Sequence, residues 1–145
     1  MKTILTKLLK VIFFGKINKV KKEPITTDFH ISEIKISVYF GEYTFEIKPT
    51  KEAFDFAKEL VGQINNFKQK ASEELLDIYN NNWREEDEKV LTKKEFEENL
   101  IEPSILIFEE KGVADLYFSD SGMFCHHTIQ VSIENGKYVN TNYIG

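Results

Sequence analysis

The hydrophobic pattern of this chain changes twice along its length, and these changes restrict the fold more than any other feature. From Phe29 to Lys48, apolar and polar residues alternate, which predicts β-strands. From Thr50 to Leu100, apolar residues recur every three or four positions, which predicts helices. After Pro103 the alternation returns. Strands, then helices, then further strands are typical of an α+β domain whose helices pack on an antiparallel sheet.

The first alternating segment predicts a β-hairpin. Gly41 and Glu42 fit a two-residue turn that has glycine at its first central position. This turn would place Phe40 opposite Tyr43 and would continue with apolar residues opposite each other on both strands. Turn chemistry and hydrophobic pattern therefore agree on the same hairpin.

Three helical segments are predicted between the two strand regions. Thr50 is expected to cap the first, whose apolar stripe continues to Phe67. The second covers residues 72–79 and ends at a run of three asparagines, which compete for backbone hydrogen bonds. Thr92 and Glu95 have the spacing of a capping box, so they predict the start of a short third helix.

The last third of the chain predicts a four-stranded antiparallel meander, because turn residues separate its apolar runs. The expected strands are residues 104–109, 113–119, 123–134 and 137–144. For the last turn we expect a three-residue loop, 134–136, with glycine at a bulge. This loop pairs Val131 with Val139 and His127 with Tyr143, whereas a two-residue turn would place apolar residues opposite asparagines.

The average composition hides a division of charge. The chain has 145 residues and a net charge of −5, yet residues 1–22 carry seven lysines and no acidic residue. Residues 23–145 carry 12 basic and 24 acidic side chains, so this part is strongly acidic. Pro24 disfavours a helix in the residue before it. We therefore expect a basic leader, residues 1–23, followed by a single α+β domain, residues 24–145.

The spacing of apolar residues in the leader predicts a short amphipathic helix over residues 1–14, with lysines on one side. Lysines interrupt its apolar run and no small-residue cleavage site follows, which argues against a secretory signal. The run is also shorter than the roughly twenty apolar residues of a membrane-spanning helix. Two interpretations stay open: the leader binds an anionic membrane surface, or it docks on the acidic domain of its own chain. The single cysteine suggests a reducing compartment, so we expect a cytoplasmic protein, membrane-peripheral in the first interpretation.

The chain's one cysteine and two of its three histidines lie together at Cys125, His126 and His127. Neighbouring strand residues point to opposite faces, so the two histidines would not bind one metal ion together. Cys125 and His127 would share a face, but their Cα atoms would lie about 6.5–7 Å apart, too far for a catalytic pair. We expect both in the apolar core, with His127 hydrogen-bonded. His126 and Phe124 would lie on the other face, as contact residues if that face is open to solvent.

No motif for a cofactor or a catalytic centre is present. The sequence lacks the glycine-rich dinucleotide and phosphate loops, the H-E-x-x-H zinc motif and the G-x-S-x-G nucleophile elbow. The acidic charge of residues 23–145 also disfavours specific nucleic-acid binding, because it repels phosphates. We therefore predict no catalytic residue, no metal site and no cofactor.

Three segments together resemble an uncharacterised bacterial family, domain of unknown function 2262: residues 78–83 (IYNNNW), 91–96 (LTKKEF) and 123–131 (MFCHHTIQV). In that family, an Asn…Trp segment after a helix and an L-T-x-x-E-F helix precede a strand of F-W-G-H-x-I type. The likeness spans about residues 75–145. Four positions carry the family residue: Trp83, Glu95, Phe124 and His127.

Two positions depart from this family pattern. Cys125 stands where tryptophan is usual, and His126 stands where glycine is usual. A side chain at position 126 would fill space that the glycine leaves open. The resemblance implies a small cytoplasmic bacterial protein in a group whose members look like accessory or immunity proteins of toxin systems, and it supplies no catalytic residues.

These observations favour a non-enzymatic protein-binding module, such as an immunity protein that occludes a basic toxin with its acidic surface. The charged run at residues 84–88 is expected to form a solvated loop. The expected binding residues are Trp83, Glu85, Glu86, Asp120, Phe124 and His126. A structural or functional role is expected for Cys125, His127 and Tyr143. The alternatives are a small enzyme that uses His127 or His126, and a membrane-peripheral protein that binds through residues 1–22.

Overall fold

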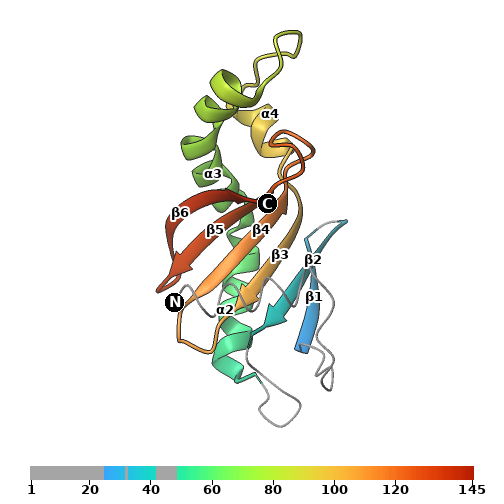
Figure 1. Cartoon of the computed structure of the whole chain (residues 1–145). Helices are drawn as coiled ribbons and strands as arrows, with labels where there is room; N and C mark the ends of the chain where they lie inside the picture. Colours follow the sequence, from blue (N-terminus) through green and yellow to red (C-terminus); the bar gives the residue numbers. More distant parts are fainter. Residues whose placement is uncertain (1–24, 32, 42–48) are drawn as a thin grey trace, which may run out of the picture.

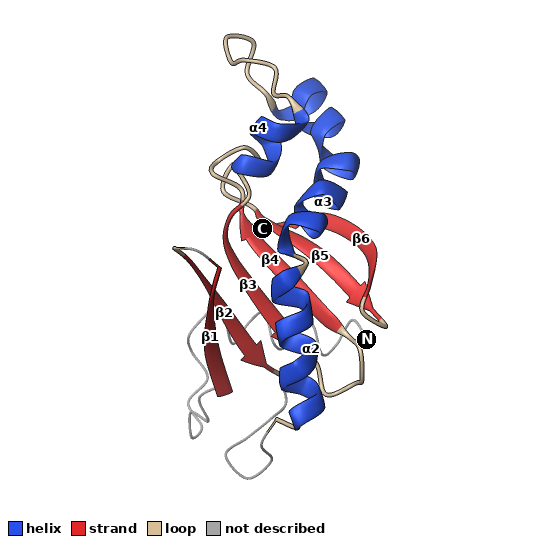
Figure 2. Ribbon diagram, turned by 180° about the vertical axis from the view of Figure 1, so that it is seen from behind, coloured by secondary structure: helices blue, strands red, loops and turns tan. Residues whose placement is uncertain are grey.

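The computed structural model describes residues 25–31, 33–41 and 49–145. The predicted leader lies outside this part of the chain. Figure 1 shows one sheet with helices behind it, and Figure 2 shows the same sheet from the helix side. The strands are β1 (Ile25–Ile31), β2 (Ile34–Phe40), β3 (Ile101–Ile107), β4 (Ala114–Ser119), β5 (Thr128–Glu134) and β6 (Lys137–Ile144). The helices are α2 (Lys51–Gly62), α3 (Ile64–Ile78), the π-helical turn η1 (Tyr79–Trp83) and α4 (Lys93–Glu98).

The sheet has six strands in the order β1-β2-β3-β4-β5-β6, so its spatial order follows the chain. All neighbouring pairs are antiparallel except β2 and β3, which are parallel and are connected through the helical region. The α+β class and the four-stranded meander are confirmed. The sheet itself is mixed, because a crossover through helices brings β3 alongside β2 in the same direction.

The N-terminal hairpin lies earlier in the chain than the sequence predicts. The chain reverses between Ile31 and Ile34, which lie opposite each other, so β2 pairs with the preceding β1. The expected turn at Gly41-Glu42 is therefore not the turn of this hairpin, and the backbone N–H of Gly41 donates to the carbonyl of Ile107 on β3 at 2.8 Å. The second strand that we expected, 43–48, lies outside the described residues.

Local capping interactions define the helix starts as predicted. The side-chain oxygen of Thr50 accepts a hydrogen bond from the backbone N–H of Ala53 at 3.1 Å. Thr92 and Glu95 form the complete capping box at the start of α4. The expected second helix, 72–79, is wrong at its start: α3 begins at Ile64, directly after a break at Gln63, so the first predicted stripe is divided between α2 and α3.

The core lies between the helices and one face of the sheet. Period-two alternation in β4 places Leu116 and Phe118 on this face, where both are buried, and places Asp115 and Tyr117 on the other face. The same alternation in β2, β3 and β5 completes the buried face. The fully buried large residues of the core, from sheet and helices together, include Ile36, Phe40, Phe67, Phe96, Ile105, Ile107, Phe118 and Ile129. None of the described helices lies on the opposite face of the sheet, here named the helix-free face (Figure 1).

The turn between β5 and β6 differs from the expected three-residue loop. Asn135 and Gly136, with φ of 52° and 71°, form a two-residue turn, as expected for a type I′ hairpin. A bulge at Val139 then shifts the register, so Val131 pairs with Thr141 rather than with Val139. Val139 is the extra residue of this bulge and is 43% exposed. Because of the bulge, the asparagines of β6 do not lie opposite the apolar residues of β5.

Among the described residues, no helix is both long enough and apolar enough to cross a membrane.

The position of Leu116 in a central strand yields a stability prediction. Leu116→Ala should lower the free energy of unfolding by about 2–5 kcal/mol, because the lost contacts leave a cavity between sheet and helices. Val139→Thr at the exposed bulge is the matched control and should change it by less than about 0.5 kcal/mol. Urea denaturation measures both. Equal effects would contradict the assignment of Leu116 to the core.

Candidate functional site

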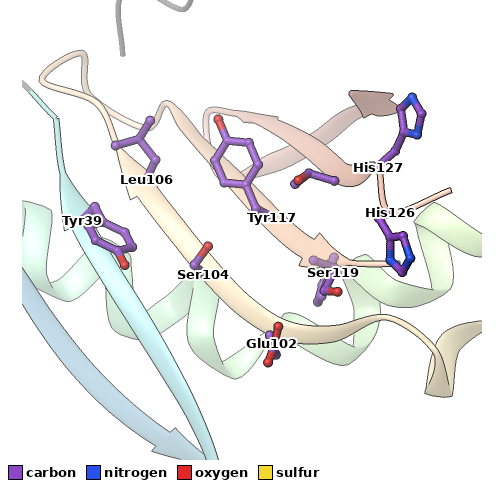
Figure 3. A pocket seen from close by; sticks show the side chains of 10 residues that line it. Tyr39, Glu102, Ser104, Leu106, Tyr117, Ser119, His126 and His127 are labelled. Atoms are coloured by element: carbon purple, nitrogen blue, oxygen red, sulfur yellow. The ribbon is translucent and has the colours of Figure 1, made fainter. Parts of the chain in front are cut away.

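The helix-free face of the sheet carries a pocket of about 260 Å³ (Figure 3). Its lining residues come from β2, β3, β4, the segment between β4 and β5, and the first residue of β5. Among the described residues they are Tyr39, Glu102, Ser104, Leu106, Tyr117, Phe118, Ser119, His126, His127 and Thr128. The pocket therefore depends on how the backbone is shaped at the ends of β3 and β4.

A bulge near the start of β3 brings Glu102 to the pocket. Ile101 pairs with Ser119 and Ser104 pairs with Tyr117, so two residues of β3 lie opposite one residue of β4. Glu102 has a positive φ of 51°, which costs a non-glycine residue about 1–2 kcal/mol. Its side chain is exposed and lines the pocket.

Successive turns, rather than a strand, connect β4 to β5. Backbone hydrogen bonds of 3.0–3.2 Å close turns from Asp120 to Met123, from Gly122 to Cys125 and from Phe124 to His127. The predicted strand 123–134 is therefore wrong in its first part, because β5 begins at Thr128.

Asp120 stabilises these turns. Its carboxylate accepts hydrogen bonds from the backbone N–H groups of Gly122 at 2.8 Å and Phe124 at 2.7 Å. The side chain is 1% exposed. An aspartate that binds nearby backbone amides competes with strand formation. We expected Asp120 in a contact surface, and the structure places it beneath the turns instead.

The turns place Cys125 and His126 in solvent. Both are exposed, and their φ angles are 53° and 66°. The prediction that Cys125 lies in the apolar core is wrong, because the strand that would bury it does not form. His126 lines the pocket. Its positive φ is one that a glycine would adopt without strain.

His127 is half-buried and lies against aromatic rings. Its Nδ1 forms a hydrogen bond with the carbonyl oxygen of Phe124. Its ring meets those of Trp83 and Tyr143 edge-on, with centroids 5.5 and 5.9 Å apart. A Cβ on Gly145 would lie 2.7 Å from the ring, so the last residue packs directly on it. His127 and Tyr143 are neighbours as expected, although the strand partner of Tyr143 is Ile129.

Phe124 is the centre of an aromatic cluster. It is fully buried, stacks on Tyr143 at 5.1 Å and meets Trp83 and Tyr79 edge-on at 5.5 and 5.7 Å. We expected Phe124 as a contact residue on an open face, but the helical region covers it. Of the other expected binding residues, Trp83 is half-buried and Glu85 and Glu86 are exposed on the loop after η1.

Asp115 is a buried carboxylate that sequence reasoning missed. It lies on the helix-free face, 5% exposed, and accepts hydrogen bonds from Gln130 at 2.9 Å and from the Tyr117 hydroxyl at 3.3 Å. Burial raises the pKa of Asp115, and the hydrogen bonds from Gln130, Ser132 and Tyr117 oppose this rise. Burial and the neighbouring Asp115 carboxylate raise the pKa of Tyr117. Strand alternation marks Asp115 as a surface residue, so no local pattern distinguishes it.

The described residues contain no group of three His, Cys, Asp or Glu side chains positioned to hold a metal ion. The pocket instead offers one carboxylate, imidazole and hydroxyl groups, and tyrosine rings. These groups suit hydrogen bonding and cation binding.

The comparison with protein families identifies the chain. A model of an uncharacterized family conserved in bacteria, DUF2262, matches residues 21–144. The chain belongs to this family. The resemblance seen over its second half therefore extends to the described strands and helices of the first half. No curated protein and no solved structure matches the chain.

In this DUF2262 member, Asp115 predicts an unusual pH dependence. Because burial raises its pKa above the ordinary 3.8, the folded state holds this proton more tightly than the unfolded chain. The associated stability is present at low pH and is lost as pH rises through the raised pKa. Asp115→Asn cannot ionise, so its free energy of unfolding relative to wild type should increase as pH rises above the ordinary 3.8 and through the raised pKa. Urea denaturation across this range measures the difference.

Asp28→Asn is the control with the opposite sign. A hydrogen bond from Lys35, followed by one from Ser37, lowers the pKa of the exposed Asp28 carboxylate. The stability contributed by Asp28 is therefore lost as pH falls through its lowered pKa. If the free energy of unfolding of both variants relative to wild type changed with pH in the same direction, this result would contradict the burial of Asp115.

His127 yields a second prediction for this family member. His127→Gln should lower the free energy of unfolding by about 1–2 kcal/mol, because it removes the ring contacts with Trp83 and Tyr143. His126→Asn at the exposed neighbour should have little effect, since asparagine tolerates a positive φ. Thermal unfolding compares them. Unchanged stability of His127→Gln would instead favour a catalytic use of the imidazole.

Proposed function

We propose that this DUF2262 protein is a non-enzymatic binding module that docks on a basic protein through residues 84–88, here named the acidic loop. The observation that carries the proposal is the set of hydrogen bonds that holds this loop in one shape while its outer carboxylates face solvent. The loop follows η1 and projects beyond α3 and α4 at one end of the molecule (Figure 2).

Arg84 holds the acidic loop from inside. Its guanidinium donates hydrogen bonds to the backbone carbonyls of Asn80 at 3.3 Å, Glu85 at 2.9 Å and Glu88 at 2.5 Å. The one basic residue of the loop is therefore directed toward carbonyl oxygens of its own backbone. This arrangement leaves the net negative charge of the loop for a partner.

Two further residues close the loop at its base. The Glu88 carboxylate accepts hydrogen bonds from the backbone N–H of Glu85 at 3.0 Å and from the Tyr79 hydroxyl at 3.4 Å. The Asn80 side chain accepts from the N–H of Leu91 at 2.9 Å and donates to its carbonyl at 3.0 Å. A loop ordered before binding loses less conformational entropy when a partner docks.

The outer carboxylates are available for intermolecular contacts. Glu85, Glu86 and Asp87 are exposed, and within the described part of the chain no ion pair involves them. Trp83 adds a half-buried aromatic ring at the base of the loop. Acidic surfaces accelerate association with basic partners and select against acidic ones.

The partner class that we propose is a basic protein, such as a toxin whose working surface an immunity protein occludes. The excess of 24 acidic over 12 basic side chains in residues 23–145 supports a basic rather than an acidic partner. Long-range attraction by the whole domain would bring such a partner to the loop, and the ordered carboxylates would then fix its orientation.

A charge-matched pair of variants tests this proposal. The loop variant carries E85Q, E86Q and D87N. The control variant removes three exposed carboxylates elsewhere with E109Q, E110Q and E134Q. Tagged full-length protein first captures a stoichiometric partner from the native host, and calorimetry then measures the affinity of the purified partner. We expect the loop variant to weaken binding about tenfold or more and the control by less than about threefold.

Salt provides the second readout, because affinity that rests on charge pairs falls as ionic strength rises. The loop variant should show a smaller salt dependence than the control variant. Equal losses in the two variants would contradict a specific role for the loop, and the absence of any stoichiometric protein partner would contradict the binding function itself.

A further inference from the structure

The pocket on the helix-free face is built from strained backbone at two separate places. Glu102 has a φ of 51° and His126 has a φ of 66°, and both line the pocket. The first lies in the β3 bulge and the second in the turns after β4. Non-glycine residues held at positive φ cost free energy and gather at functional sites. The strain therefore favours a functional use of these two side chains.

The two ends of the pocket differ in chemistry. Figure 3 shows Tyr39, Leu106 and Tyr117 toward one end, and Glu102, Ser119 and His126 toward the other. The first end is apolar and aromatic. The second offers hydrogen-bond acceptors around a carboxylate. A ligand that fits both ends has an aliphatic stem and a head that donates hydrogen bonds.

The electrostatics select a positively charged head. No lysine or arginine is among the described lining residues, whereas Glu102 contributes a carboxylate. The Tyr117 hydroxyl donates its hydrogen bond to the carboxyl group of Asp115, so a second acidic group lies at the hydroxyl end of this side chain. An anionic head would meet the Glu102 carboxylate, and none of the described lining residues is a lysine or arginine that would balance the two charges.

The size of the pocket limits the ligand to a small one. Its volume of about 260 Å³ lies just below the roughly 300–1,000 Å³ that is usual for drug-sized ligands. We propose that this pocket binds a primary alkylammonium group, with the ammonium at Glu102 and the alkyl stem along Leu106 and Tyr117. The site is independent of the acidic loop, which contributes no residue to it. The same chemistry is presented by a free amine and by a lysine side chain.

Titration of the full-length protein with n-butylammonium chloride tests the pocket, with backbone amide shifts in two-dimensional NMR as the readout. Matched probes are n-butanol, which lacks the charge, and butyrate, which reverses it. We expect saturable shifts at the amides of residues 102, 104, 117–119 and 126 with n-butylammonium. Binding of n-butanol should be about tenfold weaker, and butyrate should give no saturable shift at these amides.

Glu102→Gln retains the shape of the side chain and removes its charge, and it should weaken n-butylammonium binding about tenfold. Glu134→Gln, also exposed but outside the pocket lining, is the matched control and should leave the affinity unchanged. Thermal unfolding confirms that both variants are folded. Equal affinity for the three probes, no saturable shift at the pocket amides, or an unchanged affinity in Glu102→Gln would overturn the proposal.

A last arm distinguishes the two sources of the ammonium group. N-acetyl-lysine methylamide presents a lysine side chain as a protein does, and its Nε-acetylated form lacks the charge. Shifts with the first compound and not with the second would support recognition of a lysine. Shifts with n-butylammonium but not with the lysine compound would support a free amine.

Discussion

Burial of only one face of the sheet is the constraint on which the rest of this structure depends. The helices cover one side, so each central strand must place its large apolar side chains at alternate positions. In β4 these are Leu116 and Phe118, while Asp115 and Tyr117 are placed on the opposite face. A slip of one residue would exchange the two faces. The register that fills the core therefore also positions the strand residues that line the pocket, such as Tyr117 and Ser119.

The end of β4 connects this core to both proposed binding regions. The buried Asp120 carboxylate accepts two backbone N–H groups and so holds the turns that carry His126. The same turns direct Phe124 into the aromatic cluster, where it meets Trp83 of η1. The acidic loop begins at the next residue. Loss of the Asp120 hydrogen bonds would leave buried amides unpaired, and we expect it to affect the pocket and the loop together.

Features set by neighbouring residues could be predicted from the sequence, and features set by distant contacts could not. The helix caps predicted at Thr50 and Thr92 are confirmed. They could be predicted because each depends on a hydrogen bond between residues only three positions apart. The turn between β1 and β2 was missed because the sequence between Ile31 and Ile34 contains no glycine, whereas Gly41 is a strong turn signal. The strand expected at Cys125 fails because Asp120 binds the backbone locally. The buried position of Asp115 follows from tertiary packing, which strand alternation alone cannot reveal.

Neither of the two strained residues that line the pocket is itself part of the core. Glu102 and His126 are both exposed, so neither contributes a large buried surface that would repay its positive φ. A glycine at position 126 would adopt the same backbone without a Cβ penalty. An imidazole there costs this chain about 1 kcal/mol or more. That cost is understandable if the side chain is used at the pocket, where it lies beside a carboxylate that is strained in the same way.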